Sequence, residues 1–146
     1  MIDEETLEGL SDDQKSAFDL MMSGKNVFLT GEAGTGKSHL LRLFSDHCGK
    51  RVVRIASTGA AAAHIQAETA HKFFGLSVHV YDPGSADPSP EVRQKIAAAD
   101  VIIYEECSMS RYDVIEQMLD VIRHSRPVTA EMPFGAQMIM VGDFAQ

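Results

Sequence analysis

A glycine-rich stretch of eight residues, which begins at Gly31, limits the folds open to this chain more than any other feature. It matches the pattern G-x-x-x-x-G-K-[ST] and lies between a short apolar run, 26–30, and a helical pattern, 38–48. Glycine allows backbone conformations in which successive N–H groups point inward, and the start of the next helix adds the positive end of its dipole. The stretch predicts a phosphate-binding loop, in which Lys37 reaches the β- and γ-phosphates and the Ser38 hydroxyl binds Mg²⁺; the alternative is a strand-to-helix turn without a ligand. The residues predicted to bind nucleotide are Gly31, Glu32, Ala33, Gly34, Thr35, Gly36, Lys37, Ser38 and His39.

Short apolar runs alternate with helical patterns along the rest of the chain. This alternation predicts an α/β domain with a mostly parallel sheet, helices on both faces, and ligands at the carboxyl ends of the strands. Ser11 and Gln14 form a capping-box pattern for a helix that ends at Gly24, and 80–90 is expected to be an exposed loop. We expect strands at 26–30, 52–56, 101–104 and 137–141, and further helices at 38–48, 59–66, 69–74, 90–99 and 111–124. Predicted core residues include Met21, Met22, Phe73, Phe74 and Met118.

Composition excludes several classes of protein. Apolar residues make up 45% and charged residues 23% of the 146 residues, which is globular, and no apolar run is long enough to cross a membrane. The N-terminus lacks the apolar segment of a signal peptide, and Cys48 and Cys107 are too few for a disulfide scaffold, so we expect a cytoplasmic protein. The net charge of −8 argues against an overall grip on nucleic acid, but residues 1–20 alone carry a net −6. We expect an acidic tail over 1–10 and one domain over 11–146.

Two adjacent acids, Glu105 and Glu106, follow the third predicted strand. In an enzyme with a phosphate loop, one carboxylate at this place holds Mg²⁺, usually through water, and the next polarises the attacking water. Adjacent side chains on an extended segment point in opposite directions, so the two acids can divide these roles. The alternative is a pair of solvated acids. Asp143, after the last strand, is either near the γ-phosphate or a turn residue.

Five segments together make the chain resemble the N-terminal ATPase domain of superfamily 1B DNA helicases, the 5′-to-3′ group. The closest likeness is to the petite-integration-frequency (PIF) type, and RecD is more distant. The likeness runs from about Leu10 to Gln146. The segments are 10–14, which resembles an adenine-reading Q motif; 31–38, Walker A; 56–61 with 69–75, motif Ia and the region after it; 105–109, Walker B; and 142–146, motif III.

The resemblance implies a RecA-like fold in which the last strand inserts between the first and third. It implies that Gln14 contacts adenine, which is compatible with its capping role, that Glu105 and Ser38 hold Mg²⁺, and that Glu106 activates water. Gln146 would couple the γ-phosphate to DNA. Glu105 departs from the usual Asp of Walker B, Tyr104 replaces an aliphatic residue and Lys72 replaces a Ser. The residues expected along single-stranded DNA are Thr58, Gly59, Thr69 and His71, with Phe73 and Phe74 assigned to the core and His71 open to a surface or capping role.

The implied activity is ATP hydrolysis that drives 5′-to-3′ movement on single-stranded DNA, in replication, repair, recombination or telomere maintenance. Helicases of this type need a second RecA-like domain that supplies an arginine finger, so we expect this chain alone to be nearly inactive. Its net charge predicts weak DNA binding by the chain in isolation, and we expect a monomer. A bacterial protein would associate with the nucleoid. Two alternatives remain: a P-loop switch or remodelling ATPase that does not move on DNA, and a nucleotide-binding module without catalysis.

Overall fold

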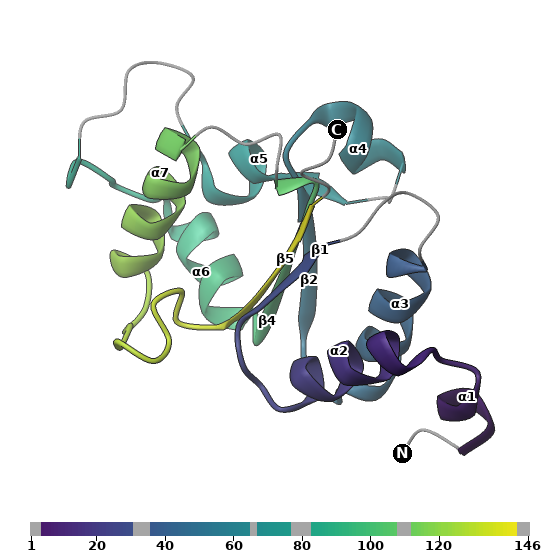
Figure 1. Cartoon of the computed structure of the whole chain (residues 1–146). Helices are drawn as coiled ribbons and strands as arrows, with labels where there is room; N and C mark the ends of the chain where they lie inside the picture. The colour runs from purple at the N-terminus through teal and green to yellow at the C-terminus, as the bar shows by residue number, and fades with distance from the viewer. Residues whose placement is uncertain (1–3, 31–35, 65–66, 77–82, 108–111, 143–146) are drawn as a thin grey trace.

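The protein is built around one parallel sheet of five strands (Figure 1). The computed structural model describes residues 4–30, 36–64, 67–76, 83–107 and 112–142. The strand order is β1-β5-β4-β2-β3, so the last strand lies between the first and β4, as the resemblance predicted. The strands are β1 (Val27–Thr30), β2 (Val52–Ala56), β3 (Glu68–Thr69), β4 (Val101–Glu105) and β5 (Gln137–Gly142).

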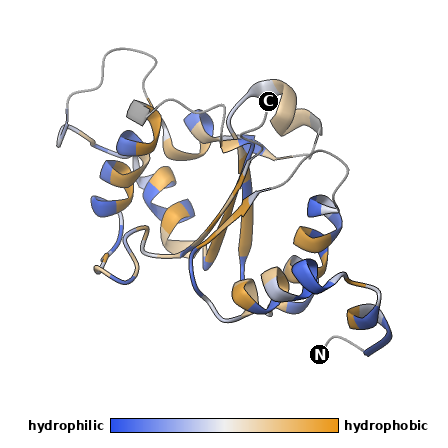
Figure 2. Cartoon of the chain, in the orientation of Figure 1, coloured by the Kyte–Doolittle hydropathy of each residue, from blue (hydrophilic) through white to orange (hydrophobic). Residues whose placement is uncertain are grey.

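Helices cover both faces of this sheet (Figure 1). One face packs against α2 and α3, and the other packs against α5, α6 and α7. Figure 2 shows the apolar sides of these helices turned toward the strands. The helices are α1 (Glu4–Glu8), α2 (Asp12–Met22), α3 (Lys37–His47), α4 (Gly59–His64), α5 (Ala70–Phe74), α6 (Pro90–Ala98) and α7 (Tyr112–Arg123).

Local signals in the sequence explain where most helices begin. The Ser11 hydroxyl accepts the Gln14 N–H at 3.2 Å and the Gln14 side chain accepts the Ser11 N–H at 2.9 Å, which confirms the predicted capping box. The hydroxyls of Ser89 and Thr69 cap α6 and α5 in the same way. The predicted elements therefore agree with the observed ones to within a residue or two at most ends.

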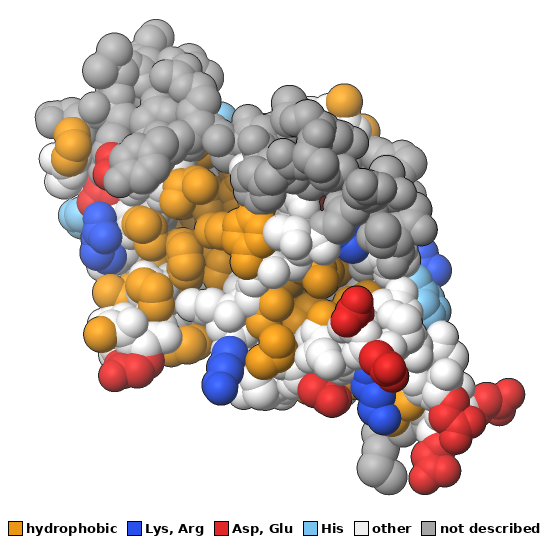
Figure 3. Space-filling model, viewed as in Figure 1, with side chains coloured by type: hydrophobic (Ala, Val, Ile, Leu, Met, Phe, Trp, Pro, Cys, Tyr) orange, Lys and Arg blue, Asp and Glu red, His pale blue; other side chains and the backbone are white. Residues whose placement is uncertain are grey.

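Three features differ from the sequence-based expectations. Residues 4–8, predicted as tail, form the short helix α1, which buries no side chain; Figure 3 shows acidic side chains gathered at that end of the molecule. The two-residue strand β3 has too short an apolar pattern to be foreseen. Met21 and Met118 are fully buried, but Met22 is 39% exposed because it is the last residue of α2 and faces away from the sheet.

The edge strand β1 is fixed to the end of the chain by side chains as well as by the backbone ladder. Val27 pairs with Ile139, and the Asn26 side chain accepts the Met138 N–H at 2.8 Å. The buried Gln137 side chain donates to the carbonyl of Met21 at 2.7 Å, which joins β5 to the end of α2. These bonds hold β1, which precedes the glycine-rich stretch in the sequence, in register with the centre of the sheet.

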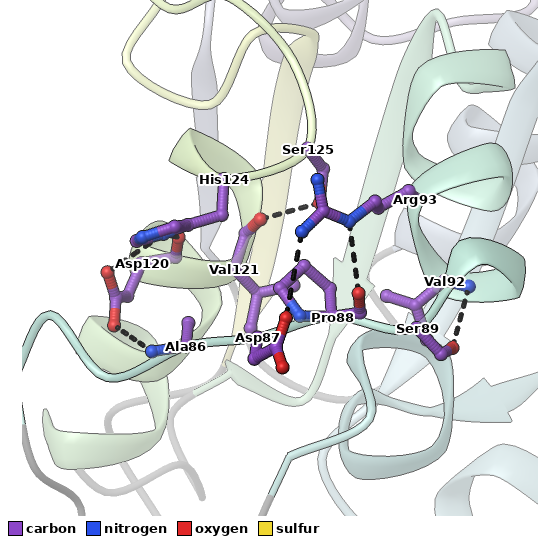
Figure 4. A network of polar contacts seen from close by, with 10 residues as sticks. All are labelled: Ala86, Asp87, Pro88, Ser89, Val92, Arg93, Asp120, Val121, His124 and Ser125. Carbon is purple, nitrogen blue, oxygen red and sulfur yellow. Dashed lines mark hydrogen bonds and ion pairs between the residues drawn. The ribbon is translucent and has the colours of Figure 1, made fainter.

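The segment before α6 is anchored by the buried carboxylate of Asp120 on α7 (Figure 4). Its Oδ2 accepts the Ala86 N–H at 3.2 Å, and its Oδ1 lies 3.3 Å from Nδ1 of His124. Arg93 on α6 donates to the Pro88 carbonyl at 3.0 Å. The described part of the predicted loop, 83–89, is therefore held against the two helices although most of its side chains are exposed.

Candidate nucleotide-binding site

The N-terminus of α3 follows directly on the glycine-rich stretch. Gly36, the N-cap residue, has φ +83°, a left-handed backbone conformation that residues other than glycine adopt only at a cost in free energy. Lys37 and Ser38 occupy the first turn, where the backbone N–H groups and the helix dipole favour an anion. Ser38 and His39 are exposed and Lys37 is half-buried. Residues 31–35 of the predicted loop lie outside the described residues.

Gln14 on α2 lies against this turn. A Cβ atom added at Gly36 would overlap Nε2 of Gln14, so an alanine there would displace the Gln14 side chain, while the backbone angle itself favours glycine. The α2 N-terminus and the α3 N-terminus are therefore in contact at the same edge of the sheet. This places Gln14 beside the predicted phosphate loop while it still completes its capping box.

Strand register places Glu105 at the same edge. Leu29, Val141 and Glu105 are paired in one row across β1, β5 and β4, and paired residues of parallel strands point to the same face. Leu29 and Val141 pack in the cluster that contains the α3 residues Leu40 and Leu41. The Glu105 side chain is therefore on the face of the sheet that α3 covers, where a carboxylate predicted to hold Mg²⁺ has to be.

Glu105 is held by Arg54, an arginine that the motif analysis did not connect with it. Nη2 and Nε of Arg54 on β2 lie 2.7 and 2.9 Å from Oε2 of Glu105. Glu105 is buried, with its side chain 11% exposed, and Arg54 is 30% exposed. Both contacts reach the same oxygen, so Oε1 takes no part in the ion pair. A charged residue within the apolar strand 52–56 was the available signal.

Glu106 lies beyond the end of β4 and is exposed. Its φ is +56°, so the backbone is left-handed there and the expected alternation of an extended strand does not extend to it. The two acids are in different surroundings, since Glu105 is buried and Glu106 is exposed. The left-handed backbone at Glu106, and not the alternation of an extended strand, accompanies this difference. The hydroxyl of Ser57, the residue after β2, donates to the Glu106 carbonyl at 2.8 Å.

The residues expected along DNA lie at the carboxyl ends of β2 and β3. Thr58 accepts the Ala61 N–H at 3.2 Å and Thr69 accepts the Lys72 N–H at 3.2 Å, so both hydroxyls cap short helices. Gly59 begins α4 and is exposed, and His71 on α5 is half-buried. These four residues therefore share one end of the sheet. Phe73 and Phe74 are buried and in edge-to-face contact, which confirms their assignment to the core.

Several predictions fall outside the described residues or concern absences. Asp143 and Gln146 are not among the described residues. Within the described ranges, no three His, Cys, Asp or Glu side chains are grouped to hold a metal ion, and no helix has both the length and the apolarity to span a bilayer. Cys48 is half-buried and Cys107 is buried, and burial raises the pKa of the Cys107 thiol.

Comparisons with known proteins agree with this geometry. A family model of PIF1-like helicases matches residues 9–146. ATP-dependent DNA helicase Pif1 of Bdellovibrio bacteriovorus and ATP-dependent DNA helicase PIF1 of Homo sapiens are 38% and 34% identical over 94% of this chain. The chain spans 32% and 22% of those two proteins.

Solved structures show the same fold. Bacteroides Pif1 bound to single-stranded DNA superposes with a TM-score of 0.80 at 28% identity, and the complex of Bacteroides Pif1 with ADP-AlF4 with 0.81 at 26%. Both matches cover 94% of this chain, and 32% and 33% of the structures compared. The architecture is thus the RecA-like α/β fold of P-loop NTPases.

Proposed function

Since the chain belongs to the PIF1-like helicase family, we propose that it is the ATP-binding domain of a DNA helicase that couples ATP hydrolysis to 5′-to-3′ movement along single-stranded DNA. The observation that carries the proposal is the meeting of three groups at one sheet edge: the α3 N-terminus, Gln14 and the acids Glu105 and Glu106. Bacteroides Pif1 has been solved in one structure with ADP-AlF4 and in another with single-stranded DNA, which supports the proposal.

The nucleotide is held at the start of α3. Lys37 supplies a positive charge for the β- and γ-phosphates, and the N–H groups of the first turn bind phosphate oxygens with the help of the helix dipole. Gln14 lies at the same place and is the candidate contact for adenine. Residues 31–35 are proposed to form the rest of the phosphate-binding loop.

The oxygens of Ser38 and Glu105 suit a hard cation such as Mg²⁺, which takes oxygen ligands and keeps several waters. Both residues are on the α3 side of the sheet, and the ion pair with Arg54 engages only Oε2 of Glu105. When bound there, Mg²⁺ would neutralise phosphate charge. The side chain of Glu105 is longer than that of the usual Asp, and the ion pair with Arg54 fixes its direction.

Hydrolysis requires a water aimed in line with the γ-phosphate. Glu106 is the exposed acid at this edge, and we assign it the role of orienting that water and accepting its proton. Lys37 and an arginine from a second RecA-like domain would stabilise the charge that develops on the phosphate. Gln146 is proposed to connect the γ-phosphate to DNA.

Single-stranded DNA is proposed to run along the carboxyl ends of β2 and β3. Thr58, Gly59, Thr69 and His71 lie there, and their backbone N–H and hydroxyl groups suit contacts to phosphate, which position a strand without reading its sequence. Because the chain spans about a third of its bacterial relative, the second RecA-like domain belongs to the proposal. Monomeric action in the cytoplasm or nucleoid, in genome maintenance, belongs to it as well.

The test is ATP hydrolysis by the full-length protein with and without single-stranded DNA. We expect stimulation by DNA, a loss of at least about 100-fold for Lys37→Ala, and little change for Lys50→Ala, an exposed lysine at the opposite ends of the strands. Unwinding should require a 5′ overhang. Hydrolysis that DNA does not stimulate would instead favour a remodelling ATPase, and a strict 3′-overhang requirement would overturn the polarity.

A further inference from the structure

Among the described residues other than glycine, Glu106 alone has a positive φ, at +56°. Glutamate rarely adopts this conformation, because its Cβ then approaches the backbone carbonyl. Such a conformation persists only where the surrounding structure holds it. The direction of the Glu106 side chain depends on this angle, so whatever holds the backbone also sets where the carboxylate points.

The contact at the right place comes from β2. Ala56 and Glu105 are paired in register as the last residues of β2 and β4, and Ser57 and Glu106 follow them directly in the sequence. Past the last paired residues, the Ser57 hydroxyl donates to the Glu106 carbonyl at 2.8 Å and continues the connection between the two strands. A hydroxyl-to-carbonyl bond at this position restrains the peptide plane that follows Glu106 and so its ψ, one of the two angles that define the left-handed conformation.

Ser57 is also the residue before Thr58 and Gly59, which are proposed to face DNA. A shift of this segment when DNA binds would move the Ser57 hydroxyl, and the Glu106 peptide with it. We propose that Ser57 is a positioning residue that fixes Glu106 and transmits DNA binding at 58–59 to the orientation of the water-activating carboxylate. This inference rests on the proposed function, in which Glu106 activates water.

The decisive variants are Ser57→Ala and Ser57→Thr in the full-length protein. Ser57→Ala should lower the DNA-stimulated kcat by roughly five- to tenfold, the usual worth of one neutral hydrogen bond, while the KM for ATP and the Kd for single-stranded DNA stay within about twofold. Ser57→Thr keeps the hydroxyl and should restore most of the rate. Ser125→Ala removes an equivalent hydroxyl-to-carbonyl bond, 2.7 Å long at the end of α7, and should leave kcat unchanged.

A measurement independent of turnover is amide hydrogen exchange over 101–107. Single-stranded DNA should slow exchange there in the wild-type protein, and this protection should be lost in Ser57→Ala. The inference is overturned by any of three results. These are a kcat of Ser57→Ala equal to that of the wild type, a loss that appears only in KM or Kd, and a failure of Ser57→Thr to restore the rate. The proposed function is judged separately, by whether the wild-type protein responds to DNA; if it does not, both fail.

Discussion

The ion pair between Arg54 and Glu105 makes a quantitative prediction for stability. Exposed pairs contribute about 0–1 kcal/mol, whereas removing one partner of a buried pair costs about 3–5 kcal/mol. This pair lies between those limits, because the Glu105 side chain is 11% exposed and Arg54 is 30% exposed. We therefore expect Arg54→Met to lower the free energy of unfolding by about 2 kcal/mol, since it strands a nearly buried carboxylate.

The reverse change should cost less. Glu105→Gln leaves a guanidinium that can still reach water, so we expect a loss of about 1 kcal/mol. In the double variant the stranded charge is gone, and the coupling energy of the cycle should be about 1–2 kcal/mol. Arg51→Met is the matched control, because Arg51 and Asp100 are 73% and 46% exposed and 3.8 Å apart.

Urea unfolding of the 146-residue chain, followed by far-UV circular dichroism because the chain has no tryptophan, measures the free energy of unfolding of each protein. These proteins are the wild type, the two single variants, the double variant and the control. The control should change stability by less than about 0.5 kcal/mol. A coupling energy no larger than about 0.5 kcal/mol, or equal effects of Arg54→Met and Arg51→Met, would refute the view that burial gives this pair its strength.

Three further outcomes are expected. Gly36→Ala and Gly49→Ala both place alanine at a positive φ and should each cost about 1 kcal/mol, but only Gly36→Ala should weaken binding of a fluorescent ADP, by at least tenfold, because only its Cβ meets a neighbouring side chain. Because burial raises the pKa of Cys107, iodoacetamide should label it more slowly than Cys48 at pH 8, with a rate that increases at higher pH; equal labelling in mass spectra would contradict this. Asp120→Ala should cost about 1–2 kcal/mol in urea unfolding and speed amide exchange in 83–89, since it leaves a backbone N–H without its acceptor.

Much of the fold could be predicted because local signals coincide with tertiary ones. Strands 52–56 and 101–104 are apolar runs that end at polar residues, and the helix caps at Ser11 and Ser89 are marked by residue type. The assignment of Met22 to the core is wrong: of the two adjacent methionines only Met21 is buried, and Met22, the last residue of α2, is exposed.

The candidate site was only partly predictable for a different reason. Residue type and spacing suffice to name Lys37, Ser38 and the two acids as candidates, and the roles given to them are those that the motifs predict. The Arg54 and Ser57 contacts depend on the register of β2 against β4, which no local pattern specifies. The left-handed backbone of Glu106 likewise lies beyond the strand end and has no marker such as glycine in the sequence.

The strand order has a consequence for how the chain folds during synthesis. Asn26 and Met138, which join β1 to β5, are 112 residues apart, so β1 has no partner strand until nearly the whole described chain has been made. At about 5–20 residues per second, β1 is without its partner strand for roughly 6–22 s. During that interval β2 and β4, only 49 residues apart at Ser57 and Glu106, can already pair. The strand end that carries Glu105 could thus form on the ribosome before β1, the strand that precedes the predicted phosphate loop, has a partner.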